Sequence, residues 1–458
     1  MAHKGYKGDS PGKKVTRFRM WMNNSALMGM VGIPHVGSFV LAGDGGDIAV
    51  LDSFEIPRDK IYAVDFEIDK LKLCHDKYPG IHIFNEEAGL VSKNLTDKYN
   101  SVHLDFCGRL SAKNILTYAD VERNMSFPGF IFVTLLKGRE RIDRKGSKEL
   151  LWGNCSRGAR RDLLRFYQKR SDHLKDNSSK CVLGLAKHIL SMRDGERFDP
   201  KIALSWSEKR YRFVFKNDEK TPKNLIIPKT RKLSPLGQGM IRIDALQKSA
   251  LIVNELRRFE RMRKNLPISR FDRDVDIRIG SIMTYHSKTK KDHGTPFVCG
   301  TVFYSSIEKM KEIRNALLNN FLRLSHFDSK ESMSQLKSII LSSSKTTSTH
   351  CLSEIFGIPK GTISAWKAHS TMGNYTNDYI PAFKISSKEE DMYGGERIGV
   401  NWGSIRAAVR KDASVIPSHR PSIKTKVLKP PMFGKKHCSK STASLVEKGE
   451  QEDVNPNK

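Results

Sequence analysis

The chain has 458 residues, more than one hydrophobic core ordinarily organises, so two or three domains are expected. Hydrophobic residues make up 38% of it, and 80 Lys and Arg outnumber 50 Asp and Glu, for a formal net charge of +30. Such an excess indicates a polyanionic partner, nucleic acid before a membrane surface, because the sequence contains no apolar run long enough to span a bilayer. It also shows no secretion signal, which predicts a cytoplasmic protein of a prokaryotic cell or a virus-infected host cell.

The seven cysteines are scattered along the chain and never spaced as CxxC. An odd number without metal-ligand spacing excludes a disulfide framework and a structural zinc site, so no metal is expected. Free thiols are typical of a reducing compartment, and we expect most of them to be small, buried core residues.

The first segment, residues 1–20, mixes basic residues with Gly and Ser and shows no apolar period. It is interpreted as a flexible basic arm that includes Lys13, Lys14, Arg17 and Arg19.

From Phe39 onward, short apolar runs alternate with helix-length spacers, the pattern of βαβ units and a parallel sheet. The predicted strands are Phe39–Leu41, Ile61–Val64, Ile81–Phe84, Val102–Leu104 and Phe130–Val133. The fold class is therefore α/β, with a Rossmann-like, mostly parallel sheet.

A basic helical stretch from Glu149 to Lys175 follows the sheet. Residues 176–243 are weakly periodic and are interpreted as an insertion with one strand-like run at Tyr211–Phe215. From Leu246 to Phe259, apolar residues recur every three or four positions, which predicts a helix whose other face is basic through Lys264.

Further on, Asp276–Tyr304 contains two alternating or apolar runs around a polar turn, which predicts an antiparallel hairpin. A helix over Ile307–Leu324 is expected to lead to a small, mainly helical domain. Beyond Val415 the chain lacks the apolar content to fold. The predicted division is an arm at 1–20, a Rossmann-like domain at 21–306 with the insertion at 176–243, a helical domain at 307–414 and a basic disordered tail at 415–458.

Glycine and acidic residues follow the first strands where each ends. Gly43, Asp44, Gly45 and Gly46 come directly after the first strand, where a Cβ would hinder a tight turn and the approach of a nucleoside. Acidic residues also stand at the ends of the later strands. Asp65 and Glu67 follow the second strand, Glu86 follows the third, and Asp105 ends the fourth.

Together, in this order, these motifs resemble those of class I, Rossmann-type S-adenosylmethionine-dependent methyltransferases, over roughly residues 30 to 305. The resemblance implies that S-adenosylmethionine is the cofactor, and that the glycine turn, Asp44 included, contacts its methionine and ribose. It also implies that Asp65 or Glu67 holds the ribose, Glu86 lies near the adenine, and Asp105 lies near the transferred methyl group.

The resemblance is incomplete at two motifs. Ala42-Gly43 stands where the family usually has an acidic residue before its glycines. The fourth strand ends in Asp105-Phe106-Cys107-Gly108, which matches neither the amino nor the cytosine-C5 methyltransferases, so the methyl acceptor stays open. The alternative is an ordinary strand-to-helix turn with aspartates that cap strand ends. Cys107 could act as a nucleophile, but a buried core cysteine is the favoured interpretation.

Residues 351–369 predict two short helices joined at Gly357, with apolar residues able to close a small core. The segment resembles the helix-turn-helix of bacterial and phage DNA-binding proteins. That resemblance implies that Lys360, Thr362, Ser364, Lys367 and His369 face the major groove or its phosphates. A helix pair without DNA contact is the alternative. The helix predicted at Val400–Lys411 would complete the module or form a solvated face.

The favoured hypothesis is a methyltransferase that acts on nucleic acid, DNA before RNA. A non-catalytic DNA-binding protein or regulator with a degenerate Rossmann domain is the main alternative. A different nucleotide-using α/β enzyme is disfavoured because the chain has no GxxxxGK[ST] motif.

Overall fold

A computed structural model describes residues 10–137, 140, 155–174, 177–192, 198–216, 235–266, 275–287, 295–320, 324–327, 336–341, 344 and 348–372. The first nine residues, the helix predicted at Val400–Lys411 and the predicted tail at 415–458 lie outside these ranges.

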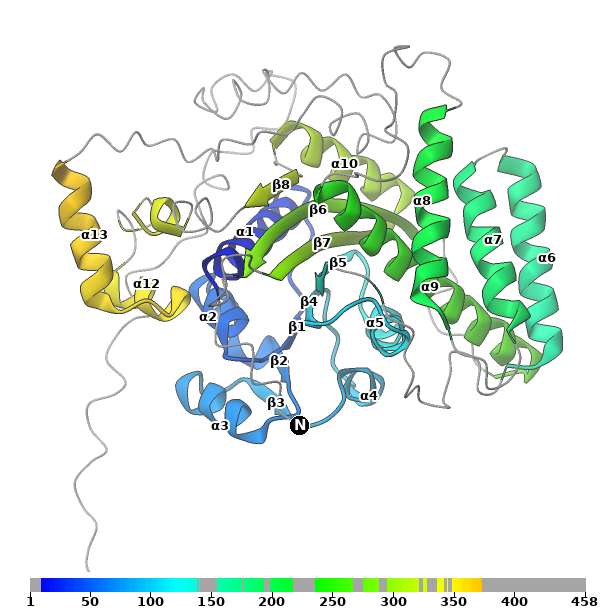
Figure 1. The fold of residues 1–458 in the computed structure, drawn as a ribbon. Coiled ribbons are helices and arrows are strands. Elements are labelled where there is room, and N and C mark those ends of the chain that lie inside the picture. The colour runs from blue at the N-terminus through cyan, green and yellow to red at the C-terminus, as the bar shows by residue number, and fades with distance from the viewer. Residues whose placement is uncertain are drawn as a thin grey trace, which may run out of the picture.

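An eight-stranded sheet forms the centre of the fold, in the order β3-β2-β1-β4-β5-β7-β6-β8 (Figure 1). The strands are β1 Ser38–Leu41, β2 Ile61–Val64, β3 His82–Phe84, β4 Ser101–Asp105, β5 Gly129–Leu136, β6 Val275–Ser287, β7 Thr295–Ser306 and β8 Leu324–Phe327. Among them β7 is antiparallel to both of its neighbours, β5 and β6, and every other pair is parallel. The predicted mostly parallel sheet with an antiparallel hairpin is confirmed.

The strand order reverses between β1 and β4. From β1 the chain builds outward through β2 and β3, and it then returns to place β4 on the other side of β1. At such a reversal the connections leave β1 and β4 toward opposite faces, which opens a crevice at the carboxyl ends of these strands. The glycine turn after β1 and Asp105 at the end of β4 both lie at this edge.

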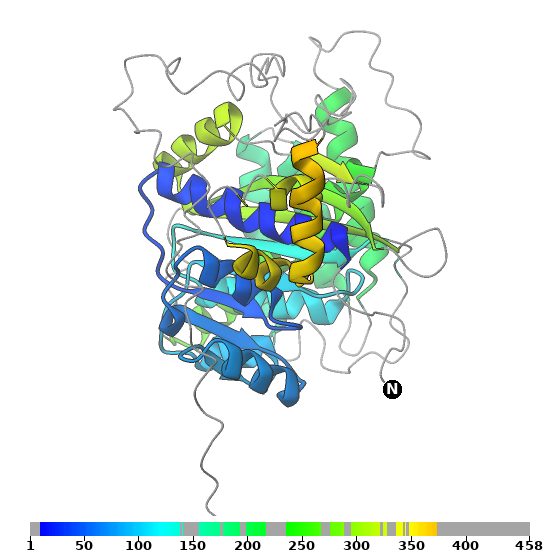
Figure 2. The same ribbon diagram turned by 90° about the vertical axis from the view of Figure 1, so that its left-hand side faces the viewer.

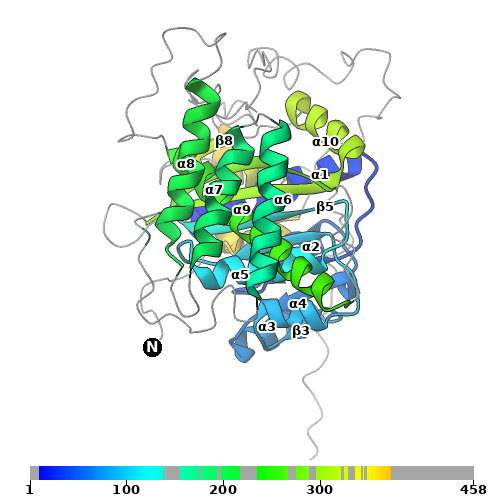
Figure 3. The same cartoon turned by 90° about the vertical axis from the view of Figure 1, so that its right-hand side faces the viewer.

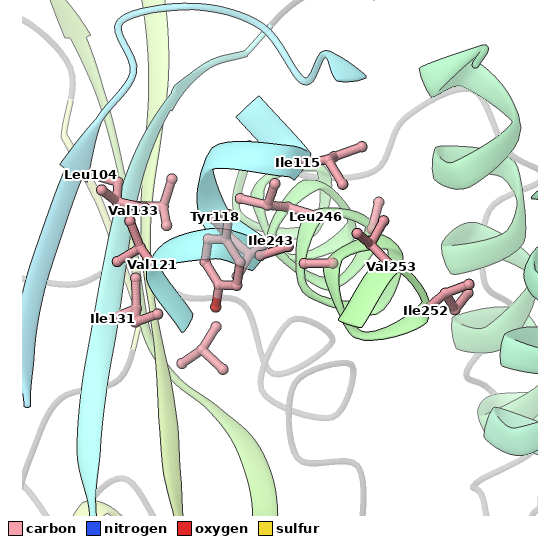
Figure 4. Packing of buried hydrophobic residues seen from close by; sticks show 14 of the residues in the cluster. Leu104, Ile115, Tyr118, Val121, Ile131, Val133, Ile243, Leu246, Ile252 and Val253 are labelled. Carbon is pink, nitrogen blue, oxygen red and sulfur yellow. The ribbon is translucent and has the colours of Figure 1, made fainter. Parts of the chain in front are cut away.

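Helices cover both faces of the sheet. One apolar cluster contains side chains of α1 Pro11–Met30, α2 Gly46–Ser53, α3 Ile68–Lys77, α10 Ile307–Asn320, α12 Thr349–Phe356 and α13 Lys360–Met372. On the other face, α4 Ala88–Asn94, α5 Ala112–Asn124 and α9 Pro235–Arg263 pack against β4 and β5. Figure 4 shows this second cluster, in which Tyr118 of α5 lies between the strands and α9, the helix that carries Leu246.

The predicted flexible arm is wrong from Pro11 onward, because these residues begin the long helix α1. Ser10 caps it, with its Oγ accepting a hydrogen bond from the backbone N–H of Lys13, and Pro11 occupies the first turn, where a missing N–H costs nothing. Phe18 and Trp21 are almost completely buried, Trp21 against β5. The basic residues concealed this helix, since Arg17 is itself buried.

The chain between β5 and α9, which includes the predicted basic stretch and most of the insertion predicted at 176–243, is mainly helical in its described residues. α6 Arg157–Leu174, α7 Asn177–Ser191 and α8 Pro200–Lys216 stand side by side next to α9 (Figure 3). The strand-like run at Tyr211–Phe215 therefore lies in a helix, and the predicted strand is wrong. The helix predicted from Leu246 is confirmed as part of α9, with Leu246 and Val253 fully buried. α10 ends at Asn320, and Leu324, predicted as its last residue, begins β8 instead.

A carboxyl group is buried between α5, α9 and β7. Glu122 has no exposed surface, its Oε2 accepts a hydrogen bond of 2.8 Å from the Asn254 Nδ2 group, and the Tyr304 hydroxyl also bonds to it. The Tyr118 hydroxyl pairs with that of Tyr304. Burial raises the pKa of Glu122 to about 8 although these bonds oppose the shift, so the group is neutral at pH 7.

We expect Glu122→Gln to match the wild type in stability below about pH 4.5 and to exceed it above about pH 8. The folded pKa of Glu122 is raised, so the wild type loses stability as pH rises from the unfolded pKa to the folded one, at about 1.4 kcal/mol per unit. Chemical denaturation across this pH range measures the difference, with the exposed Glu308→Gln as control. A constant difference between Glu122→Gln and wild type at all pH values would contradict the prediction.

Candidate active site

The glycine turn connects β1 to α2 in a conformation that suits glycine. Gly43 has φ +47° and Gly45 has φ +76°, both in the left-handed region. A Cβ on Gly45 would lie 3.1 Å from the Sγ of Cys74, whereas the space beside Gly43 is open to 4 Å. Gly46 begins α2, and Asp44 is exposed at the tip of the turn.

Asp65, immediately after β2, holds this turn in place. Its Oδ2 accepts a hydrogen bond of 3.0 Å from the backbone N–H of Gly43, and its Oδ1 accepts one of 3.0 Å from the N–H of Glu67. After β3, the Asn85 amide donates to the carbonyls of Asp65 and Phe66. The ends of β1, β2 and β3 are thus joined by side chains, which explains why polar residues follow each strand.

The other two predicted acidic residues of this region lie at the surface. Glu67 and Glu86 are both exposed, and Glu67 pairs with Lys70 at 3.0 Å. Phe66, which precedes Glu67 in the chain, is 65% exposed, and the Lys113 ammonium lies 5.1 Å from the centre of its ring. An exposed aromatic ring beside Asp65 offers a flat apolar surface to a ligand. We did not predict Phe66 from the sequence, although its place after a strand end was the available signal.

Asp105, at the end of β4, lies against a residue of the N-terminal helix. Its Oδ2 is 2.7 Å from the Nζ of Lys13, its Oδ1 accepts a hydrogen bond of 3.0 Å from the Cys107 thiol, and its side chain is 8% exposed. Burial favours a raised pKa, but the charge and hydrogen bond of Lys13, together with His103, outweigh it and hold the pKa of Asp105 at about 2. Asp105 is therefore a charged hydrogen-bond acceptor and a very weak base at neutral pH.

Cys107 is exposed beside Asp105, so the interpretation of it as a buried core cysteine is wrong. Its backbone has φ +46°, which turns the chain at the sheet edge and aims the thiol at Asp105. Desolvation and the neighbouring carboxylate raise the pKa of the Cys107 thiol to about 12. Because the thiolate is the nucleophile, the arrangement disfavours covalent catalysis by this residue.

A buried charge network lies directly behind Asp105. The Oδ1 of Asp47 accepts hydrogen bonds from Trp21 Nε1 at 2.6 Å and His103 Nδ1 at 2.7 Å, and its Oδ2 lies 3.3 Å from Arg17 Nε. Burial acts to raise the pKa of Asp47, but the facing His103 and Arg17 lower it below its usual value. The network ties α1 and α2 to β4, and so fixes the turn of α1 that carries Lys13.

The helix-turn-helix-like segment packs on the Rossmann-like domain (Figure 2). α12 ends at Gly357, which has φ +56°, and Ile355 and Phe356 join the same apolar cluster as α1 and α2. The rings of Phe356 and Phe18 are 5.2 Å apart, and the Lys14 ammonium donates to the carbonyl of Phe356. The predicted core of the helix pair thus faces the sheet-bearing domain as well as its own partner helix.

The residues predicted to contact DNA differ in how available they are. Lys360 and Ser364 are exposed, Thr362 is half-buried, and the Lys367 ammonium donates to Thr349 Oγ1 at 2.7 Å. The side chain of His369 lies outside the described residues. Of the four whose side chains are described, Lys360 and Ser364 are the exposed ones.

A cavity of about 340 Å³ adjoins the glycine turn, and neither Asp65 nor Asp105 lines it. Its walls are residues 43–46, one face of α3 and the end of α12, with Lys14, Lys70 and Phe356 among them. Within the described part of the chain, no three His, Cys, Asp or Glu side chains cluster as a metal site would require. Nor does any described helix have the length and apolarity needed to cross a membrane.

We expect Lys13→Met to raise the pKa of Asp105, since removal of the ammonium leaves burial as the dominant influence on that carboxyl. NMR titration of carboxyl-labelled aspartate measures this pKa. In the control Lys72→Met, an exposed position on α3, the pKa of Asp105 should be unchanged. If Lys13→Met also leaves it unchanged, the pair at 2.7 Å does not hold the carboxylate in its charged form.

No protein-family model matches the chain, and no curated protein matches it. Similar solved structures include the plantazolicin methyltransferase BamL, 8% identical with a TM-score of 0.27 over 63% of this chain and 85% of its own. An rRNA methylase from Streptococcus thermophilus is 12% identical with a TM-score of 0.21 over 26% and 71%. A putative sarcosine dimethylglycine methyltransferase from Galdieria sulphuraria is 13% identical with a TM-score of 0.25 over 64% and 86%. At these values the likenesses assign neither a substrate nor residue roles to this chain.

Proposed function

We propose that this chain is an S-adenosylmethionine-dependent methyltransferase that acts on nucleic acid, DNA before RNA. The observation that carries the proposal is the meeting of the glycine turn, Asp65 and Asp105 at the carboxyl edge where the strand order reverses. Open α/β sheets bind their ligands at such an edge.

The residues at this edge fit a nucleoside. The open space beside Gly43 lets a ligand approach the backbone closely, and Asp65 keeps lone pairs beyond its two backbone bonds for ribose hydroxyls. The exposed ring of Phe66 offers a stacking surface for a base, with Glu86 at the next strand end. S-adenosylmethionine, when bound, would supply a methyl group on a positively charged sulfur.

The protein's own contribution to the reaction would be orientation. Asp105, with its pKa of about 2, accepts a hydrogen bond from the acceptor group without removing its proton before transfer. Lys13 keeps the carboxylate charged and in place. Holding the acceptor in line with the methyl group lowers the barrier by proximity and orientation.

The proposal that the substrate is a polyanion rests on the net charge of the chain, +30, and on the exposed polar side of α13. Lys360 and Ser364 would contact phosphates there, as the helix-turn-helix resemblance implies. Phosphate contacts of this kind are salt-sensitive and position the polymer without reading its sequence.

One observation favours the alternative of a non-catalytic DNA-binding protein. Both oxygens of Asp65 already bond to backbone N–H groups, of Gly43 and Glu67, which is sufficient reason for an aspartate at this place. Direct measurement of donor binding distinguishes this alternative from the proposed enzyme.

We expect Gly45→Val and Asp65→Ala each to reduce S-adenosylmethionine affinity at least tenfold. Valine is strained at φ +76° and would press on Cys74, and the aspartate anchors the turn. Calorimetric titration measures the affinity, with Lys60→Ala, an exposed change at the other end of β2, as control. Absence of binding in the wild type, with nucleic-acid binding intact, would favour the non-catalytic alternative.

Asp105→Asn should abolish methyl transfer and leave donor affinity within about tenfold, a difference of about 1.4 kcal/mol. The substitution keeps the shape of the side chain but removes the charge that orients the acceptor. Radiolabelled methyl transfer to mixed DNA and RNA is the measurement. Because the substitution removes the ion pair with Lys13, Lys13→Met/Asp105→Asn is made in parallel to separate loss of function from loss of stability. Transfer that survives in both variants would make Asp105 a structural residue.

A further inference from the structure

One side of α6 carries a row of exposed cations. They are spaced four residues apart, which places them on one ridge of the helix at steps of about 6 Å. The opposite face of α6 packs into the insertion through Ala159, Leu163 and Tyr167, all buried. We call the row the outer ridge; it consists of Arg157, Arg161, Arg165 and Lys169.

Arginines of α6 and α9 that point into the fold behave differently, because each has a partner there. Arg160 donates to the carbonyl of Met192 at 3.2 Å, and Arg257 donates to Asp120 at 2.7 Å. Arg242 pairs with Glu140 at 2.9 Å. These polar contacts of α6 and α9 inside the fold are therefore formed by arginines other than those of the outer ridge.

The outer ridge has almost no countercharge of its own. Within the described ranges, a single carboxylate comes within 4.0 Å of it: Asp162 Oδ1, at 4.0 Å from Arg165 Nη1, whose side chain is 71% exposed. Such a distant, exposed pair contributes little. Neighbouring like charges repel along the helix surface, and a polyanion relieves that repulsion.

The ridge is attached firmly to the part of the fold that carries Asp105. The backbone N–H of Ser156 donates to Glu260 of α9 at 3.1 Å, and Arg263 lies so close over Gly158 that a Cβ there would be 1.7 Å from its Nη1. α9 is in turn bonded to α5, the first helix after β4, through Asn254 and Glu122. A polymer bound along α6 would thus be held at a defined position relative to the sheet.

We propose that the outer ridge of α6 binds the phosphodiester backbone of the nucleic acid. The inference rests on the proposed function only in taking this polymer to be the methyl acceptor. The charge, spacing and exposure of the ridge match a row of phosphates, which Arg binds well through its planar fork of donors. The contact is with the backbone and reads no bases.

The test uses the full chain and the variant Arg157→Gln/Arg161→Gln/Lys169→Gln. Its matched control, Lys60→Gln/Lys72→Gln/Lys98→Gln, removes the same charge from exposed positions on α3 and around β2 and β4. Fluorescence anisotropy measures the affinity of each protein for a DNA duplex and for an RNA hairpin over a series of KCl concentrations. S-adenosylmethionine affinity and thermal stability are measured on the same preparations.

For the ridge variant we expect the log–log salt slope on duplex DNA to fall by up to about 2.7, at about 0.9 per phosphate contact, and the control to keep the wild-type slope. A fall on RNA alone supports the ridge with RNA as its polymer. Equal slopes for the ridge variant and the control overturn the proposal. The proposal is also overturned if the ridge variant loses binding to anionic phospholipid vesicles but keeps the wild-type salt slopes on both DNA and RNA. If the salt slope falls in the ridge variant but the wild type shows no measurable S-adenosylmethionine binding, the ridge proposal is supported and the proposed methyltransferase function is contradicted. The two proposals can therefore fail separately.

Discussion

The carboxylate of Asp47 is the constraint on which the rest of the site depends. It is 2% exposed, and a charge in that setting is tolerated only when hydrogen bonds and opposite charges surround it. Those come from Trp21 and Arg17 of α1 and from His103 of β4, so the N-terminal helix must lie across the sheet for the charge to be satisfied. Removing one of these donors would leave the buried charge of Asp47 partly unpaired, and such a loss strongly lowers the stability of the fold.

The position of α1 in turn determines the electrostatics at the sheet edge. One turn before Arg17, Lys13 reaches Asp105 and keeps its carboxyl ionised despite burial. The same carboxylate raises the pKa of the Cys107 thiol and leaves that residue a weak nucleophile. The two buried carboxylates therefore have different roles, since Asp47 holds α1 on the sheet and Asp105 lies at the carboxyl edge.

The sequence was sufficient to predict the parallel strands and the hairpin, because strands buried on both faces appear as short continuous apolar runs. It also placed Gly43, Asp65 and Asp105 at strand ends, and the structure brings the first two into direct contact. It failed at α1 since Lys and Arg were taken as solvated, although burial of Arg17 depends on a partner 30 residues away. The short apolar run at Tyr211–Phe215 fits either a strand or a buried helix, and tertiary packing decided for the helix.

The neighbours Lys13 and Lys14 point in different directions from one helical turn, about 100° apart. Lys13 holds Asp105, and Lys14 holds the carbonyl at the end of α12. α1 thus connects the sheet edge to the C-terminal helix pair. A rotation of its first turn would disturb both the contact with Asp105 and the contact with α12. A ligand at α13 that shifted this turn would change the free energy of binding at Asp105, and a ligand at Asp105 would change that at α13 by the same amount, because thermodynamic linkage is reciprocal.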